Sequence, residues 1–371
     1  QSIMLIRSNR KAIVQFYHLT TIKMSLNTYK YNKIFRLESG ASLQNVEITY
    51  TTLGKLNTKR DNVIWITHAL TANSNPEEWW NGLVGKGKFF NPENYFIVCA
   101  NVLGSAYGST GPLSENPDTG NKYYHNFPNV TIRDIVKGFE LLKGYLKVQK
   151  IHTLLGGSLG GQQALEWSIL NPTLIKNLFL IATNAKHSPW GIAFNESQRL
   201  AITADRSWYS YSDDAGLKGL KAARSIALLS YRNYNTYGST QEDNREVVDD
   251  YKASSYQNYQ GEKLVNRFNA FSYWTLSKAM DSHDVGRERG SLEKALSQVQ
   301  ANTLVVAVNS DLLFPVSESI LIADNIKEAE LEVIESLYGH DGFLIETDQL
   351  KELFEKFYLT QKLKTKRYEY A

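Results

Sequence analysis

Six short, almost continuous apolar runs recur along the chain and restrict its possible folds more than any other feature. They are rich in Val, Ile, Leu and Phe, which is typical of strands buried on both faces of a parallel sheet. These runs occupy residues 62–70, 95–104, 151–157, 175–183, 302–310 and 331–336. A further segment, residues 46–56, alternates apolar and polar side chains and predicts a half-exposed strand.

Helical segments lie between the predicted strands. Residues 131–148 place apolar side chains on one helical stripe, with Thr131 as the predicted N-cap and Asp134 three residues later. The segment that follows the run at 151–157 also has the pattern of a helix. Strands alternating with helices predict a doubly wound α/β domain with a mostly parallel sheet.

The alternation lapses over residues 186–296, where helical stretches occur without a comparable strand run. We interpret this region as a helical insertion that forms a lid over the strand ends. The core domain then consists of residues 24–185 and 297–371. Residues 1–23 are basic and contain no acidic side chain, and we interpret them as an N-terminal extension.

Composition excludes several classes of partner. The 371 residues carry a formal net charge of +3 and no basic stripe interleaved with aromatic side chains, which argues against nucleic acid. No run approaches the roughly 18 apolar residues that cross a membrane. The lone cysteine, Cys99, lies in an apolar run, which predicts a buried thiol and a reducing, cytoplasmic location. No pair of histidines has metal-ligand spacing with a third ligand close by, so no metal site is expected.

Residues 156–160 read GGSLG between a predicted strand and a predicted helix. This G-x-S-x-G pattern is typical of a sharp turn that presents a nucleophilic serine, here Ser158. Glycines two residues before and after the serine remove side chains that would collide in the turn. The alternative interpretation is a turn needed only for packing.

A nucleophilic serine needs a base, and the base needs an orienting carboxylate. In sheet domains of this type the three residues follow in the order Ser, Asp or Glu, His. Asp311 follows the run at 302–310, and His340 follows the run at 331–336, so both fit this order. Of the remaining histidines, His68 stands at the end of an early strand, where we expect it to shape a loop.

Two backbone N–H groups are predicted to bind the oxyanion that forms during acyl transfer. One belongs to Leu159, next to the nucleophile, and the other to Leu70, in the loop that reads HALT at 68–71.

With these residues in view, the chain resembles the homoserine O-acetyltransferases, a branch of the α/β-hydrolase superfamily. The resemblance extends over about residues 30–360. The motifs that carry it are HALT (68–71), WWNGLVGKGK (79–88), NVLGSAYGSTGP (101–112), FPNVTIRDIV (127–136), GGSLGGQQALEW (156–167), FNESQRLAI (194–202), MDSHDVGR (280–287), SDLLFP (310–315) and GHDGFL (339–344).

The resemblance implies an α/β-hydrolase fold and a Ser158–Asp311–His340 triad that moves an acetyl group from acetyl-CoA to the side-chain hydroxyl of L-homoserine. The product would be O-acetyl-L-homoserine, a precursor of methionine. Acetyl-CoA would be a co-substrate, no cofactor would stay bound, and the family implies a homodimer formed through the helical lid. By motif position, Arg224 matches the arginine that pairs with the carboxylate of the substrate. Asp341 matches the acid that holds the ammonium group of the substrate, and Tyr231 matches a tyrosine that lines the tunnel to the site.

Two departures from the family pattern affect the surroundings of the serine. Leu159 and Gln162 stand where the family usually has methionine, and Ala72 replaces the glycine that commonly follows the threonine of the HALT loop.

Other activities fit the same triad. The donor could be succinyl-CoA, or the acceptor could be L-serine. In a serine esterase, water would be the acceptor. A further alternative is a non-catalytic binding protein of the same fold. A succinyl donor would favour a cation near the HALT loop, and residues 68–75 contain none. A long lid and Arg224 both argue against a simple esterase.

Overall fold

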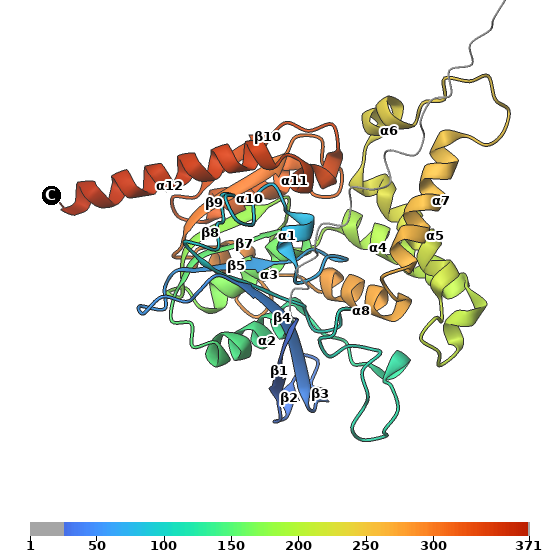
Figure 1. The fold of residues 1–371 in the computed structure, drawn as a ribbon, viewed down its shortest axis with the longest axis horizontal. Helices are drawn as coiled ribbons and strands as arrows, with labels where there is room; N and C mark the ends of the chain where they lie inside the picture. The colour runs from blue at the N-terminus through green and yellow to red at the C-terminus, as the bar shows by residue number, and fades with distance from the viewer. Residues whose placement is uncertain (1–25, 370–371) are drawn as a thin grey trace, which may run out of the picture.

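An eight-stranded sheet lies at the centre of the molecule (Figure 1). The computed structural model describes residues 26–369, so the predicted extension at 1–23 lies outside the described residues. Strands β5 to β10 run parallel to one another, and β1 and β4 form an antiparallel edge. In spatial order the strands are β1 (Asn27–Tyr31), β4 (Val46–Leu53), β6 (Phe96–Ala100), β5 (Val63–Thr67), β7 (Ile151–Gly157), β8 (Ile175–Ile181), β9 (Asn302–Val308) and β10 (Glu330–Ile334).

Both faces of this sheet are buried, as the continuous apolar runs predict. Along β5, Val63 and Trp65 belong to one apolar core and Ile64 and Ile66 to the other. The first core packs against α2 (Ile132–Tyr145), α3 (Leu159–Leu170) and α10 (Val316–Asn325), and the second against α12 (Thr347–Glu369). The predicted doubly wound α/β architecture is confirmed.

The predicted N-cap of α2 is also confirmed. The side chain of Thr131 accepts a hydrogen bond from the backbone N–H of Asp134, and the Asp134 carboxylate accepts one from the backbone N–H of Thr131. This reciprocal capping box satisfies two N–H groups that have no partner within the helix. The chain therefore enters the helix at the residue that the sequence indicates.

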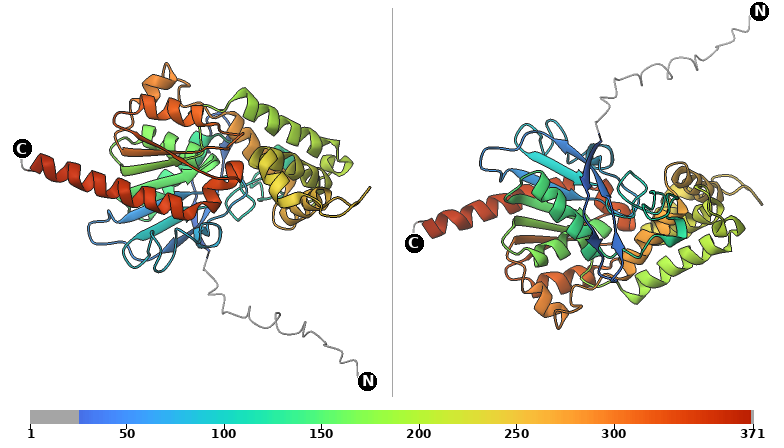
Figure 2. Two further views of the ribbon diagram at one scale, coloured as in Figure 1. Left: turned by 90° about the horizontal axis from the view of Figure 1, so that it is seen from above. Right: turned by 90° about the horizontal axis from the view of Figure 1, so that it is seen from below.

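Helices occupy the chain between β8 and β9. All but the last of them lie together at one side of the sheet (Figures 1 and 2), and the last packs against α10. Among the described residues, no strand longer than an isolated bridge occurs there. These elements are α4 (Pro189–Ala204), η2 (Arg206–Tyr209), α5 (Leu217–Tyr231), α6 (Tyr234–Gln241), α7 (Lys252–Val265), α8 (Ala270–Asp281) and α9 (Leu292–Leu296).

Several short elements complete the fold. None of the described helices is both long and apolar enough to cross a membrane. A small antiparallel pair, β2 and β3, near the described N-terminus was not predicted. The short elements are β2 (Phe35–Arg36), β3 (Ser42–Leu43), α1 (Pro76–Trp79), η1 (Tyr124–Asn126), η3 (Gly339–Asp341) and α11 (Gly342–Ile345).

Candidate active site

Ser158 lies in the turn between β7 and α3, with φ 58° and ψ −128°. A positive φ is rare for a residue with a side chain and marks a constrained turn. Side chains at the neighbouring glycines would clash with the backbone. A Cβ on Gly160 would lie 2.1 Å from Thr67 O, and a Cβ on Gly156 would lie 2.4 Å from Gly160 C. The turn therefore follows from its glycines, and it leaves Ser158 5% exposed.

Asp311 and His340 follow β9 and β10, and the structure brings them together. Asp311 Oδ2 lies 2.7 Å from His340 Nδ1, while Asp311 Oδ1 accepts hydrogen bonds from the backbone N–H groups of Leu313 and Phe314. Because a carboxylate only accepts hydrogen bonds, Nδ1 carries the proton and Nε2 of the neutral ring is free to take one. This is the tautomer that a general base needs.

One aromatic ring connects His340 with the serine turn. The ring of Phe343 lies 5.3 Å from that of His340, and a Cβ on Gly157 would lie 2.4 Å from Phe343. Among the described residues, Ser158 Oγ and His340 form no hydrogen bond. Such bonds are often long without substrate and tighten in the reacting complex. The structure thus gives the Asp–His half of the predicted triad and places it beside the serine turn.

Two opposing effects set the pKa of His340. Burial lowers the pKa because it disfavours the charged ring, whereas Asp311 and, to a smaller extent, Asp341 raise it. The net result is a pKa above the usual value of 6.5. His340 must therefore lose a proton before it acts as a base, and this sets an acid limb in the rate.

Asp311→Asn is expected to lower kcat by about 10⁴-fold, because an amide can hold the imidazole in the wrong tautomer. It should also move the acid limb of kcat/KM to lower pH, since the carboxylate raises the pKa of His340. Steady-state rates across the neutral pH range measure both effects. A variant with an unmoved acid limb would show that Asp311 does not set this pKa.

The two N–H groups predicted to bind the oxyanion are both without an acceptor in the described part of the chain. Leu159 is the first residue of α3, and Leu70 lies in the loop after β5. The close approach of Gly160 to Thr67 O holds the start of α3 against the start of that loop. Free N–H groups beside a nucleophile are suited to an oxyanion.

Arg224 and Tyr231 share helix α5 and lie next to His340. The Tyr231 ring is 5.7 Å from the His340 ring, and Arg224 Cζ is 5.3 Å from the centre of the Tyr231 ring. Burial raises the pKa of Tyr231, so its phenol stays neutral. Arg224 has no ion pair among the described residues. Its charge is therefore available to an anionic group near His340.

Asp341 forms an ion pair that the sequence did not indicate. Arg232 Nη2 lies 3.2 Å from Asp341 Oδ2, and each side chain is 17% exposed. Arg232 Nε and Nη1 are buried without a partner in the described structure. Asp341 Oδ1 likewise accepts no hydrogen bond from the residues described. One carboxylate oxygen is thus held by Arg232 and the other is open to a cation.

Arg267 corrects one argument made from the sequence. Residues 68–75 contain no cation, but Arg267 reaches this loop from the turn between α7 and α8. Its guanidinium donates to Thr71 O, Thr71 Oγ1 and Tyr107 Oη. The local sequence missed it because the two residues are 196 positions apart. Because Arg267 places a cation beside this loop, the lack of one in residues 68–75 does not decide between an acetyl and a succinyl donor.

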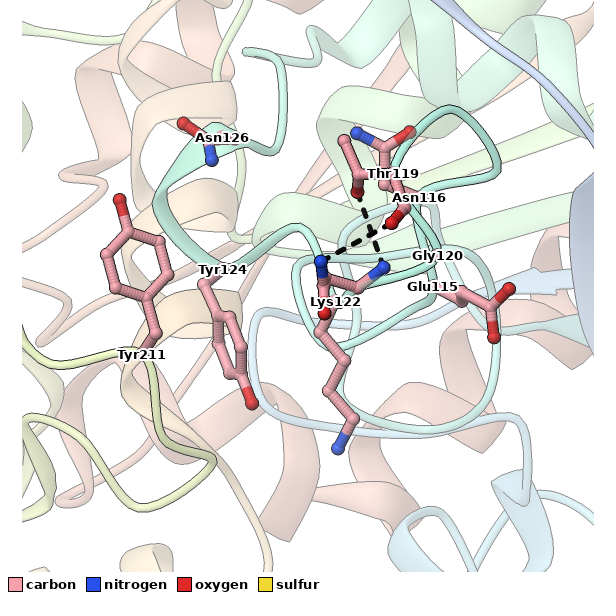
Figure 3. Close-up of a pocket in the computed structure, with 9 residues that line it drawn as sticks. Glu115, Asn116, Thr119, Gly120, Lys122, Tyr124, Asn126 and Tyr211 are labelled. Atoms are coloured by element: carbon pink, nitrogen blue, oxygen red, sulfur yellow. Dashed lines mark hydrogen bonds between the residues drawn. The ribbon is translucent and has the colours of Figure 1, made fainter.

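A pocket of about 800 Å³ lies elsewhere on the surface (Figure 3). It is formed mainly by residues 115–126, with Tyr211 from the helical insertion on its rim. The charge of Lys122 is already paired with Asp213, at 2.5 Å. No predicted site residue lines this pocket, so it is separate from the candidate active site.

Comparisons with known proteins place the chain in a family. A family model described as the alpha/beta hydrolase fold matches residues 62–347. A homoserine O-acetyltransferase of Cyclobacterium marinum is 50% identical over 346 residues, which cover 93% of this chain and 98% of that protein. One from Chlorobium chlorochromatii is 42% identical over 89% of this chain and 94% of its own length.

Solved structures give the same fold. The crystal structure of a homoserine O-acetyltransferase from Bacillus anthracis superposes with a TM-score of 0.85 at 26% identity, over 90% of this chain and 97% of that one. Esterase E22 superposes with a TM-score of 0.81 at 23% identity, over 90% of this chain and 99% of its own, and this likeness concerns the fold alone. The identities to the curated relatives are decisive: the chain belongs to the homoserine O-acetyltransferase family of the α/β-hydrolase fold.

Proposed function

We propose that the chain transfers the acetyl group of acetyl-CoA to the side-chain hydroxyl of L-homoserine and releases O-acetyl-L-homoserine for methionine biosynthesis. The observation that carries the proposal is the Asp311–His340 pair, 2.7 Å apart, beside a serine turn in a chain 50% identical to a homoserine O-acetyltransferase. Acetyl-CoA acts as a co-substrate, and the reaction needs no bound cofactor.

The reaction has two half-steps through an acetyl-enzyme. In the first, Ser158 Oγ attacks the thioester carbonyl and gives its proton to His340 Nε2. The C–S bond breaks, and His340 returns the proton to the leaving thiolate. In the second, His340 takes the proton of the homoserine hydroxyl, whose oxygen attacks the acetyl-serine. Ser158 leaves with that proton, and the N–H groups of Leu70 and Leu159 hold the oxyanion in both steps.

Homoserine carries a carboxylate and an ammonium group, so its site needs charges of both signs. We assign Arg224 to the carboxylate, because its guanidinium has no other ion-pair partner in the described chain. We assign the free Oδ1 of Asp341 to the ammonium group. Tyr231, between Arg224 and His340, would then line the path of the acyl group.

Thiol release tests the proposal and its alternatives. The protein is mixed with acetyl-CoA or succinyl-CoA, and with L-homoserine, L-serine or no acceptor. Rapid release that requires acetyl-CoA and homoserine supports the proposal. A preference for succinyl-CoA or serine would keep the mechanism and change the specificity. Equal release without any acceptor would make the protein an esterase and leave Arg224 without a role.

Arg224→Gln is expected to raise KM for homoserine by about 10- to 100-fold, because a hydrogen bond to a charged group contributes about 1.5–3 kcal/mol. Formation of the acetyl-enzyme should be unchanged, since the acetyl donor does not use this contact. Lys218→Gln, an exposed cation on the same helix, is the matched control. Equal KM values in the two variants would contradict the assignment.

The surroundings of the site lead to three further proposals. Residues 186–296 form a lid that excludes water from the acetyl-enzyme, on a core of residues 24–185 and 297–371. The protein forms a homodimer through this insertion, as the family resemblance implies. A cytoplasmic location is supported by the single, buried Cys99.

A further inference from the structure

His68 is fully buried at the end of β5, where it begins the loop that contains Leu70. Both of its ring nitrogens have backbone partners. Nδ1 lies 2.9 Å from Ala69 O, and Nε2 lies 3.2 Å from the backbone N of Val102. The ring thus connects the loop after β5 with the segment that follows β6.

These two contacts determine the tautomer of His68. The N–H of Val102 can only donate, so Nε2 must be the unprotonated nitrogen that accepts. Nδ1 then carries the proton and donates it to Ala69 O. Burial lowers the pKa of His68 to about 4, so this neutral form persists at neutral pH. Because both ring nitrogens are hydrogen-bonded to the backbone, neither is free to exchange a proton with Ser158 or a substrate.

The acceptor of this hydrogen bond shares a peptide unit with the N–H of Leu70. A trans peptide is planar, so the carbonyl of Ala69 and the N–H of Leu70 point in opposite directions. A second donor, the backbone N–H of Ala72 at 3.0 Å, also binds Ala69 O. Fixing this oxygen from two sides fixes the direction of the Leu70 N–H, which has no acceptor among the described residues.

A further contact ties His68 to the other half of the oxyanion site. Gln163 Nε2 donates to His68 O at 3.1 Å, and Gln163 belongs to α3, the helix that begins at Leu159. The backbone of His68 is thus attached to the helix that carries one predicted N–H donor, and its ring to the peptide that carries the other. His68 therefore contacts both elements that carry the predicted donors.

We infer that His68 is a positioning residue: the donation from its Nδ1–H to Ala69 O orients the N–H of Leu70 toward the oxyanion formed at Ser158. The inference rests on the proposed acetyl-Ser158 chemistry. It assigns His68 a task that is separate from that of His340, although both imidazoles lie in the same region of the fold. It also explains why a buried histidine, and not an apolar residue, follows β5.

Two isosteric substitutions separate the two hydrogen bonds of the ring. In His68→Asn the side-chain amide nitrogen takes the place of Nδ1 and can still donate to Ala69 O. In His68→Gln the amide oxygen takes the place of Nε2 and can still accept from Val102 N–H, but the donation to Ala69 O is lost. Each variant loses one hydrogen bond, so the two should unfold at similar urea concentrations.

The measurements are the rate at which p-nitrophenyl acetate acetylates Ser158, its pH profile, and the affinity for a small boronic acid that forms a tetrahedral adduct with the serine. His68→Gln should acetylate about 30- to 100-fold more slowly than the unaltered protein, which is less than the roughly 10²–10³-fold loss expected when a whole oxyanion donor is removed. Its affinity for the boronic acid should fall by a similar factor, with an unmoved acid limb. His68→Asn should stay within about fivefold in both measurements.

Equal acetylation rates in the two variants, with both folded, would overturn the inference and leave the proposed function intact. An acid limb that moves in His68→Gln would overturn it as well, because the effect would then pass through His340. If the unaltered protein is not acetylated at Ser158 by this ester or by acetyl-CoA, the proposed function fails, and the inference fails with it.

Discussion

Ser158→Ala is expected to lower kcat for acetyl transfer by about 10⁴- to 10⁶-fold, which is the largest loss of activity that we predict. The substitution removes the only oxygen of the turn that can form the acetyl-enzyme. It leaves the backbone undisturbed, because a Cβ is already accommodated there at φ 58°. Thiol release from acetyl-CoA gives the rate, and the intact mass after mixing shows whether an acetyl group is attached.

A matched control for this experiment is Ser168→Ala. Ser168 is a buried serine of α3, and its hydroxyl donates to Leu165 O at 2.7 Å, away from the turn. It should keep the full rate of transfer with at most a small loss of stability. Transfer by Ser158→Ala within tenfold of the unaltered rate, or an acetyl label on another residue, would remove Ser158 from the mechanism.

Acidification is expected to destabilise the fold steeply below pH 6.5. His68, His187 and His283 are at most 3% exposed, and burial lowers their pKa values to about 4, about 4 and about 3. In the unfolded chain each regains a pKa near 6.5, so unfolding takes up protons between these values. Their contribution to stability is complete above pH 6.5 and is lost as the pH falls toward 4.

The size of this effect is comparable with the stability of a typical domain. Each pKa unit corresponds to about 1.4 kcal/mol, so the three groups together remove on the order of 10 kcal/mol. His340 acts in the opposite direction, because its pKa is raised. Its contribution is present at low pH and is lost as the pH rises through the raised value.

Urea unfolding at several pH values measures the slope of the unfolding free energy. We expect an uptake of about three to four protons between pH 6 and 5, because burial also lowers the pKa of His152 to about 4, and about one proton fewer in His283→Gln. His283 is a suitable residue to remove because its Nε2 contacts only a backbone carbonyl, Asn184 O at 3.0 Å. A free energy that stays constant down to pH 5 would show that these rings are not buried as neutral groups.

Local sequence patterns predicted most of the core and the residues that meet in the candidate site. The apolar runs became β5 to β10, the Thr131 cap and its helix formed as expected, and Asp311 and His340 met across β9 and β10. These features depend on side chains close together in sequence, or on the rule that neighbouring parallel strands end at the same edge. Periodicity, capping and turn chemistry are therefore sufficient to find them.

Contacts between distant segments were missed for a physical reason. The pair of Arg232 with Asp341, and the donation from Arg267 to Thr71 O, join the helical insertion to loops of the core. A long, flexible cation can reach any carboxylate or carbonyl that the fold brings near, so neither spacing nor residue type reveals its partner. The contact of the His68 ring with the backbone N–H of Val102 was hidden in the same way, although the sequence suggested that this residue shapes its loop.

The parallel pairing of β8 with β9, across the whole helical insertion, has a consequence for how the molecule is made. Ser158 precedes Asp311 by 153 residues, so at ordinary rates of synthesis its turn leaves the ribosome about 10 s before its orienting carboxylate. A chain that stalls or is cut within the insertion holds a serine without a base. With the proposed Ser158–Asp311–His340 triad, such fragments would not transfer an acetyl group, and activity would begin only after β9 and β10 have joined the sheet.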